Sequence, residues 1–256
     1  MRSPRSSAVL LIALLSGTTT GLVHRGSGRF FLDTADTAEY KTFLPTGVFH
    51  GVTTNPVILQ RSGVPCNVEA IRALATECFE LGGAEFMAQA WGGDDVDKLV
   101  ETGVALNSID PSRMTVKVPV TKAGVEAARR LAAPPHNVRI CLTACYASAQ
   151  ALIAAGAGVE YLAPYLGRMS DNGKDGMAEV KRMELIARGT GSGCRILVAS
   201  LRSVAQLEEL AAAGLDTFTF GPDIARALFD ASDGLTEAAA EQFEEAAAAS
   251  AAVPAA

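Results

Sequence analysis

Hydrophobic and polar positions follow a regular succession of short and long segments from Arg29 onward. Short runs rich in β-branched and aromatic residues are typical of strands, and longer runs with Ala and Leu at helical spacing, ending near glycines, are typical of helices. The predicted strands are residues 29–34, 50–55, 85–91, 114–120, 138–144, 160–166, 195–201 and 217–220. The predicted helices are residues 68–81, 94–106, 123–131, 147–155, 176–188, 204–213 and 223–229.

This alternation indicates the fold class. Strands that alternate strictly with helices through short connections form a parallel sheet, and eight such units in about 250 residues predict a single (β/α)8 TIM barrel of the α/β class. A doubly wound open sheet is the alternative, but no glycine-rich phosphate-binding sequence follows the first strand. We expect the barrel to occupy residues 29–230 of the 256, and a C-terminal helix with an Ala-rich tail to occupy residues 231–256.

The first 28 residues have a different pattern. Arg2 and Arg5 precede an apolar run over residues 8–15 and then small residues, and no acidic residue occurs before Asp33. This order is typical of a secretory signal peptide, and the run is too short to span a bilayer. The Ser, Thr and Arg content also fits an organelle transit sequence, including a two-part signal to a plastid. We therefore expect a targeting segment over residues 1–28, with a cytoplasmic protein as the alternative.

A lysine lies in the middle of the apolar, β-branched run at residues 114–121. Because side chains along a strand alternate between faces, Lys117 shares one face with Thr115 and Pro119, while Val116 and Val118 point the other way. An amine in such surroundings either pairs with a carboxylate or serves as a nucleophile for carbonyl carbons. Lys117 is thus the first candidate for catalysis.

Polar side chains recur near the C-terminal ends of the other predicted strands. If the face of Lys117 is the barrel interior, these residues should converge with it at the catalytic mouth of the barrel. They are Asp33, Asn55, Gln89, Thr143, Tyr165 and Ser200. Arg168 and Arg202 follow strands six and seven, where guanidinium groups suit a phosphate.

Composition argues against nucleic-acid binding and against a metal site. The net charge is −6 and the pI about 5.2, and lysines and arginines cluster no further than in pairs. Nucleic acid is therefore not an expected partner. The three histidines and five cysteines are scattered without the spacing of metal ligands, so no metal site is expected.

Several strings in this sequence resemble the transaldolase family. They are Leu32-Asp33-Thr34, Gly51-Val52-Thr53-Thr54-Asn55-Pro56, Val116-Lys117-Val118-Pro119-Val120-Thr121, Ala163-Pro164-Tyr165-Leu166-Gly167-Arg168 and Ala199-Ser200-Leu201-Arg202. The resemblance runs in the same order from residue 29 to residue 243. It is strongest to the short branch of the family, which includes fructose-6-phosphate aldolase.

The resemblance implies a class I aldolase that needs no metal and no organic cofactor. Lys117 would form a Schiff base with a ketose carbonyl, and Asp33 with Asn55 would transfer protons and bind hydroxyl groups. Gln89 and Thr143 would hold the catalytic water. The remaining expected site residues are Tyr165 as a proton carrier, Thr53 in substrate binding, and Arg168, Ser200 and Arg202 at the substrate phosphate.

Two positions divide the family. True transaldolases share Glu at the position of Gln89 and Phe at the position of Tyr165. The fructose-6-phosphate aldolase group has Gln and Tyr there, and this sequence resembles that group. The expected reaction is therefore cleavage of fructose 6-phosphate to dihydroxyacetone and glyceraldehyde 3-phosphate. Transaldolase proper is the rival within the fold, and a non-catalytic sugar-phosphate sensor is the rival of another class.

Expected partners are small phosphorylated sugars, with no stable membrane association. In similar short aldolases a C-terminal helix reaches onto a neighbouring subunit of a ring. The resemblance thus implies a homo-oligomer such as a decamer, and the alternative is a helix lying on its own barrel.

Overall fold

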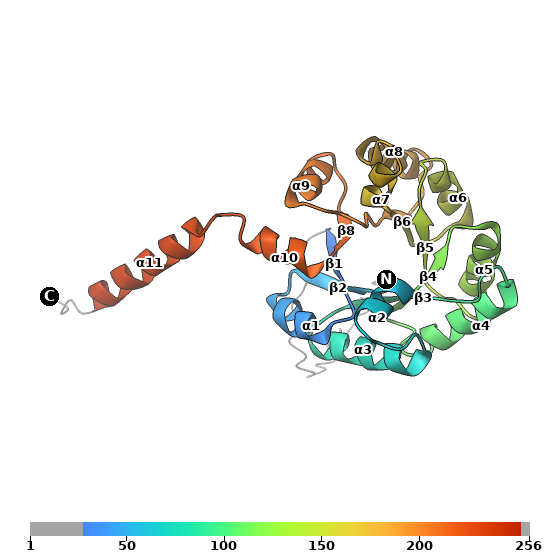
Figure 1. Cartoon of the computed structure of the whole chain (residues 1–256), viewed down its shortest axis with the longest axis horizontal. Coiled ribbons are helices and arrows are strands. Elements are labelled where there is room, and N and C mark those ends of the chain that lie inside the picture. The colour runs from blue at the N-terminus through green and yellow to red at the C-terminus, as the bar shows by residue number, and fades with distance from the viewer. Residues whose placement is uncertain (1–27, 252–256) are drawn as a thin grey trace, which may run out of the picture.

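Eight parallel strands form one continuous sheet in a computed structural model that describes residues 28–251 (Figure 1). The sheet order β7-β6-β5-β4-β3-β2-β1-β8 follows the chain, and the two edge strands meet where the Val198 N–H donates to the Thr217 carbonyl at 3.0 Å. The predicted (β/α)8 barrel is confirmed. The strands are β1 Arg29–Asp33, β2 Phe49–Thr53, β3 Glu85–Gln89, β4 Met114–Pro119, β5 Ile140–Cys145, β6 Tyr161–Pro164, β7 Arg195–Ile196 and β8 Thr217–Phe220.

Helices surround the sheet, and the side chains of Asn67, Asp95 and Ser203 cap three of them. The helices are α1 Thr37–Phe43, α2 Pro56–Arg61, α3 Val68–Glu80, α4 Val96–Asn107, α5 Lys122–Ala132, α6 Gln150–Ala157, α7 Leu166–Asp171, α8 Gly176–Gly189, α9 Val204–Ala212, α10 Pro222–Phe229 and α11 Leu235–Ala251, with a 3-10 turn at Leu44–Thr46. The sequence pattern did not predict α1, α2 and α7. Each has only six or seven residues, too few for an apolar stripe to repeat.

Strand seven is shorter than expected. Its ladder ends at Ile196, and only isolated bridges continue at Val198 and Ala199. Ser200 has a φ of 60°, a left-handed conformation that turns the chain away from extended backbone. The predicted strand over residues 195–201 was therefore wrong in its second half.

Inward-facing side chains fill the middle of the barrel. They alternate with outward-facing residues that pack under the helices, as strand geometry requires. This inner cluster is Phe31, Met87, Cys141, Tyr161, Ala163 and Leu197, all at most 1% exposed. Because the centre is closed by these side chains, open space inside the barrel is confined to its ends.

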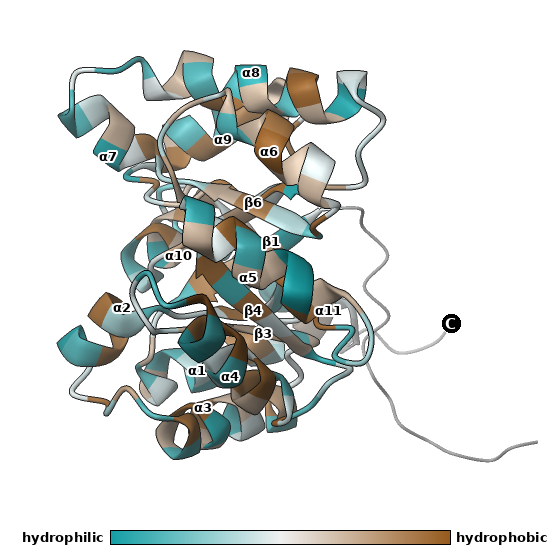
Figure 2. Ribbon diagram, turned by 90° about the vertical axis from the view of Figure 1, so that its right-hand side faces the viewer, coloured by the Kyte–Doolittle hydropathy of each residue, from teal (hydrophilic) through white to brown (hydrophobic). Residues whose placement is uncertain are grey.

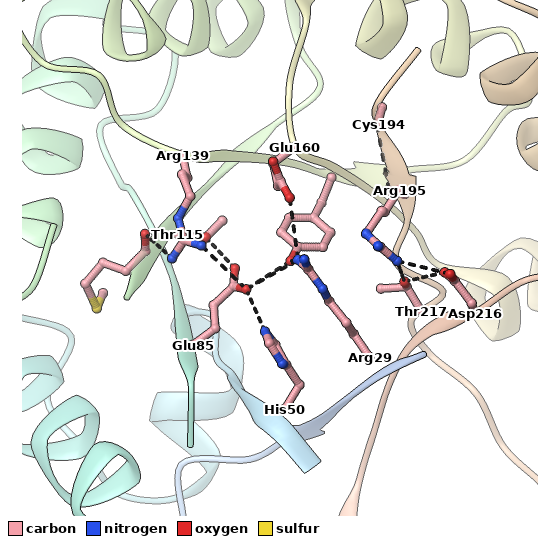
Figure 3. Close-up of polar contacts among 12 residues, drawn as sticks. Arg29, His50, Glu85, Thr115, Arg139, Glu160, Cys194, Arg195, Asp216 and Thr217 are labelled. Carbon is pink, nitrogen blue, oxygen red and sulfur yellow. Dashed lines mark hydrogen bonds and ion pairs between the residues drawn. The ribbon is translucent and has the colours of Figure 1, made fainter. Parts of the chain in front are cut away.

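A buried carboxylate organises the N-terminal end of the barrel (Figure 3). Glu85 accepts hydrogen bonds from Thr115 at 2.5 Å and Tyr161 at 2.9 Å, and Arg29 and Arg139 each lie 3.8 Å from it. Burial by itself would raise the pKa of Glu85, but the hydrogen bond with His50, the Arg139 charge and the hydroxyl donors outweigh it and lower the pKa. Glu85 therefore remains a carboxylate that links most of the strands at this end.

The last helix, α11, extends away from the barrel (Figure 1). Its apolar side chains Leu235 and Phe243 are 75% and 71% exposed. The alternative in which this helix lies on its own barrel was therefore wrong. The expected targeting segment falls, except for its last residue, outside the described residues. Within residues 28–251, no helix is long and apolar enough to cross a membrane.

Candidate active site

A cavity of about 300 Å³ opens at the C-terminal ends of the strands. Seven of the ten candidate residues from the sequence line it: Asp33, Asn55, Lys117, Tyr165, Arg168, Ser200 and Arg202. The other wall residues are Val57, Ile58, Arg61, Asp171 and Ala199. Thr53, Gln89 and Thr143 lie on the strands beneath and beside this wall.

Lys117 reaches the cavity from the inner face of β4. Its register partners are Gln89 on β3 and Cys141 on β5, so an amide and an apolar thiol flank it. The side chain is only 3% exposed, and no carboxylate of residues 28–251 forms an ion pair with it. A structural ion pair is thus excluded within the described chain. What remains is an amine buried beside apolar side chains and open to one polar cavity.

A short chain of hydroxyl groups fixes the Asp33 carboxylate. The Thr53 hydroxyl donates to Asp33 Oδ1 at 2.7 Å and lies 2.5 Å from the Thr219 hydroxyl. These residues come from β1, β2 and β8, which are neighbours in the sheet. Sequence reasoning missed Thr219, although its inward position on the last predicted strand could have indicated it. The hydroxyls orient one carboxylate oxygen and leave the other for a ligand.

Tyr165 lines the cavity from the end of β6, and a second tyrosine packs against it. Tyr165 follows β6 directly, and its hydroxyl is 3.0 Å from the hydroxyl of Thr143 on β5. Tyr146, which the sequence did not single out, packs its ring edge-on against Tyr165 at 5.7 Å between centroids. The Arg168 guanidinium lies 4.9 Å from the centroid of the Tyr165 ring. Tyr165 is therefore held in place by a hydroxyl, a ring and a cation.

Arg168 is itself held in its charged form. A hydrogen bond with Tyr146 raises the pKa of the guanidinium against the opposing effect of burial, and the negative charge of Asp33 adds to this. A cation at this position suits a dianionic phosphate.

Strand alternation predicted that Asn55 would lie on the inward face of a strand, but it lies beyond the end of β2. It is the N-cap of α2, with its side-chain oxygen accepting from the Val57 and Ile58 N–H groups at 3.0 and 3.1 Å. Pro56 at the first helical position fixes the turn. Because the carbonyl oxygen is occupied, the amide N–H groups of Asn55 are those available to a ligand hydroxyl.

Ser200 also reaches the cavity by a route other than strand alternation. The inward positions near the end of strand seven are Leu197 and Ala199, and the left-handed backbone at Ser200 turns its side chain back toward the cavity. The Gly167 N–H donates to the Ser200 carbonyl at 2.9 Å. A Cβ on Gly167 would lie 2.4 Å from that carbonyl oxygen, so only glycine permits this approach of α7.

Arg202 forms an ion pair with Asp171, the last residue of α7. Both side chains are about half exposed at the cavity wall. Sequence reasoning missed Asp171 and also Arg61, because both belong to the short helices that the pattern did not predict.

The barrel and its buried lysine define an enzyme of the class I aldolase type. The chain belongs to the Transaldolase/Fructose-6-phosphate aldolase family, whose sequence model matches residues 30–255. A protein named "Probable transaldolase" from Phenylobacterium zucineum is 35% identical over 84% of this chain and 94% of its own length. "Probable transaldolase 2" from Listeria monocytogenes is 36% identical over 73% and 81%.

Solved structures agree on the fold. Thiamine phosphate pyrophosphorylase from Pyrococcus furiosus superposes with a TM-score of 0.53 at 13% identity, covering 75% of this chain and 84% of that one. At this identity the likeness concerns the barrel alone.

Proposed function

We propose that this protein cleaves fructose 6-phosphate reversibly to dihydroxyacetone and glyceraldehyde 3-phosphate. The observation that carries the proposal is Lys117, a buried amine with no carboxylate partner among residues 28–251, at the wall of a polar cavity. A neutral primary amine in such a site attacks a ketose carbonyl and loses water to give an iminium ion. The iminium then accepts the electrons of the carbon–carbon bond that breaks.

The neighbouring residues fit the proton transfers of this route. Asp33 takes the proton of the C4 hydroxyl as that carbon becomes the aldehyde, and Asn55 donates to a hydroxyl of the ketose. The C3 carbon of the resulting enamine is reprotonated from Tyr165 or from a water held by Gln89 and Thr143. Hydrolysis of the new iminium then releases dihydroxyacetone and regenerates the amine. The 3.0 Å contact of Thr143 with Tyr165 supports a shared proton path.

Arg168, Ser200 and Arg202 are the proposed binding site for the phosphate group. They come from the turns that follow β6 and β7, a common phosphate position in such barrels. The phosphate would have to share Arg202 with Asp171, or displace that carboxylate from it.

A second candidate is transaldolase, which transfers the three-carbon ketol unit to an aldose phosphate. The names of the relatives favour it. Gln89 and Tyr165 favour the aldolase, because transaldolases share Glu and Phe at these two positions. Family membership argues against the non-catalytic sensor.

Two measurements separate these functions. Borohydride reduction in the presence of fructose 6-phosphate should attach a three-carbon or six-carbon adduct to Lys117, mapped by peptide mass. Lys117→Arg should give no adduct and no turnover, because arginine cannot lose its proton in this range. Free dihydroxyacetone should form from fructose 6-phosphate without any acceptor. If it forms only when an acceptor such as erythrose 4-phosphate is added, the protein is a transaldolase.

We also propose a homo-oligomer in which α11 contacts a neighbouring subunit, and a targeting role for residues 1–28. The exposed Leu235 and Phe243 support the first. Light scattering of the full chain and of a chain ending at residue 231 tests the oligomer, and an equal number of subunits in the two proteins would contradict it.

Fusion of residues 1–28 to a fluorescent reporter tests the targeting role, and diffuse cytoplasmic signal would contradict it.

A further inference from the structure

Arg61, the last residue of α2, lines the cavity without a partner. Its side chain is exposed, and within residues 28–251 it forms no hydrogen bond, ion pair or ring contact. This distinguishes it from Arg168, which is engaged by two tyrosines, and from Arg202, which is paired with Asp171. All five N–H donors of Arg61 remain available to a ligand.

Arg61 adds to the positive charge of the cavity wall. The carboxylate of Asp171 offsets Arg202 directly, and that of Asp33 acts on Arg168. Arg61 therefore adds to the wall a positive charge in excess of those on which Asp171 and Asp33 act, in a chain whose overall charge is −6. A phosphate monoester carries nearly two negative charges at neutral pH and needs such an excess.

Arg61 also approaches from a different side. It follows β2, whereas Arg168 follows β6, and three strands separate β2 from β6 in either direction around the closed sheet. The helices α2 and α7 lie beyond the same end of the barrel (Figure 2). Arg61 thus belongs to the opposite wall of the same cavity.

We infer that Arg61 is a further binding residue of this site, which contacts the phosphate group of the substrate from the α2 side and adds a positive charge that attracts it. The inference rests on the proposed function for the identity of the substrate. It concerns a phosphate monoester and assigns Arg61 no role in bond cleavage.

The test compares Arg61→Gln and Arg61→Lys with Arg72→Gln as a matched control. Arg72 is a half-buried arginine on α3 outside this cavity, with an ion pair to Glu69. Arg61→Gln should raise the KM for fructose 6-phosphate about five- to tenfold, below the effect of a buried charge-assisted bond because the side chain is exposed. Its KM for unphosphorylated dihydroxyacetone and glyceraldehyde should stay within about twofold. Arg61→Lys should recover most of the loss, and Arg72→Gln should match the wild type.

A binding measurement keeps the test independent of activity. Titration calorimetry with inorganic phosphate at fixed ionic strength should show weaker binding to Arg61→Gln than to the wild type and Arg72→Gln. Equal phosphate affinity in all three proteins, or equal losses with phosphorylated and unphosphorylated substrates, would overturn the inference. Failure of the proposed function is a separate outcome, because it appears in the wild type as no adduct on Lys117 or as no free dihydroxyacetone without an acceptor.

Discussion

Replacing Glu85 by glutamine should destabilise the barrel strongly although it lies far from the cavity. The side chain of Glu85 is 1% exposed, and its charge faces Arg29 and Arg139 at 3.8 Å each. Glutamine keeps the shape, but its single amide oxygen can accept from only one of Thr115 and Tyr161, which donate to different oxygens of Glu85. It also removes the anion that faces Arg139 and leaves Arg29 with Glu160 alone. Removing one partner from a buried network costs about 3–5 kcal/mol, and because Arg29 keeps its contact with Glu160 we expect a loss of about 3 kcal/mol.

Glu160→Gln is the matched control. Glu160 also lies 3.5 Å from Arg29, but its side chain is 39% exposed, so the pair contributes no more than about 1 kcal/mol. Urea denaturation at pH 7 measures both losses. For a chain of this size, a loss of about 3 kcal/mol lowers Tm by about 6–12 °C. If Glu85→Gln and Glu160→Gln lose the same free energy, the buried charge does not stabilise the fold and our description of the barrel end is incorrect.

The pH dependence gives a second check. Because the pKa of Glu85 is lowered in the folded protein, its contribution is fully present above the ordinary carboxyl value of 4.5 and is lost as pH falls through the lowered value. The difference in unfolding free energy between wild type and Glu85→Gln should therefore shrink below pH 4.5. A difference that stays constant down to the acid transition would show that Glu85 is not a charged group in the fold.

Three further predictions concern the cavity. Arg168→Gln or Arg202→Gln should raise KM for fructose 6-phosphate about tenfold or more, with little effect on dihydroxyacetone, and equal losses with both substrates would indicate a structural role instead. Tyr165→Phe should slow dihydroxyacetone release about 10²–10⁴-fold, and adding Gln89→Glu should restore carbon–carbon cleavage but not release, which an assay of free dihydroxyacetone with and without acceptor measures. Gly167→Ala should displace the turn that carries the proposed phosphate-binding residues, because its Cβ would lie 2.4 Å from a backbone oxygen. Phosphate affinity by calorimetry should therefore fall, and unchanged affinity would contradict this close contact.

The sequence by itself determined the barrel and the inward position of Lys117. Alternation along β4 is a local property, so the inward direction of Lys117 followed from its neighbours Val116 and Val118 alone. The same argument placed Asp33, Gln89, Thr143 and Tyr165 toward the mouth. Eight repeats of strand and helix leave few other ways to pair parallel strands, which is why the fold could be predicted with no contact known.

Only the tertiary structure decided the positions that depend on turns. Asn55 caps a helix too short to have a periodicity, and Ser200 faces the cavity through a left-handed residue that strand alternation cannot represent. Arg61 and Asp171 enter the site because α2 and α7 lie over the same end of the barrel. Hydrophobic periodicity records which face of an element is buried, whereas the approach of two short turns from opposite sides of a barrel depends on closure of the whole sheet.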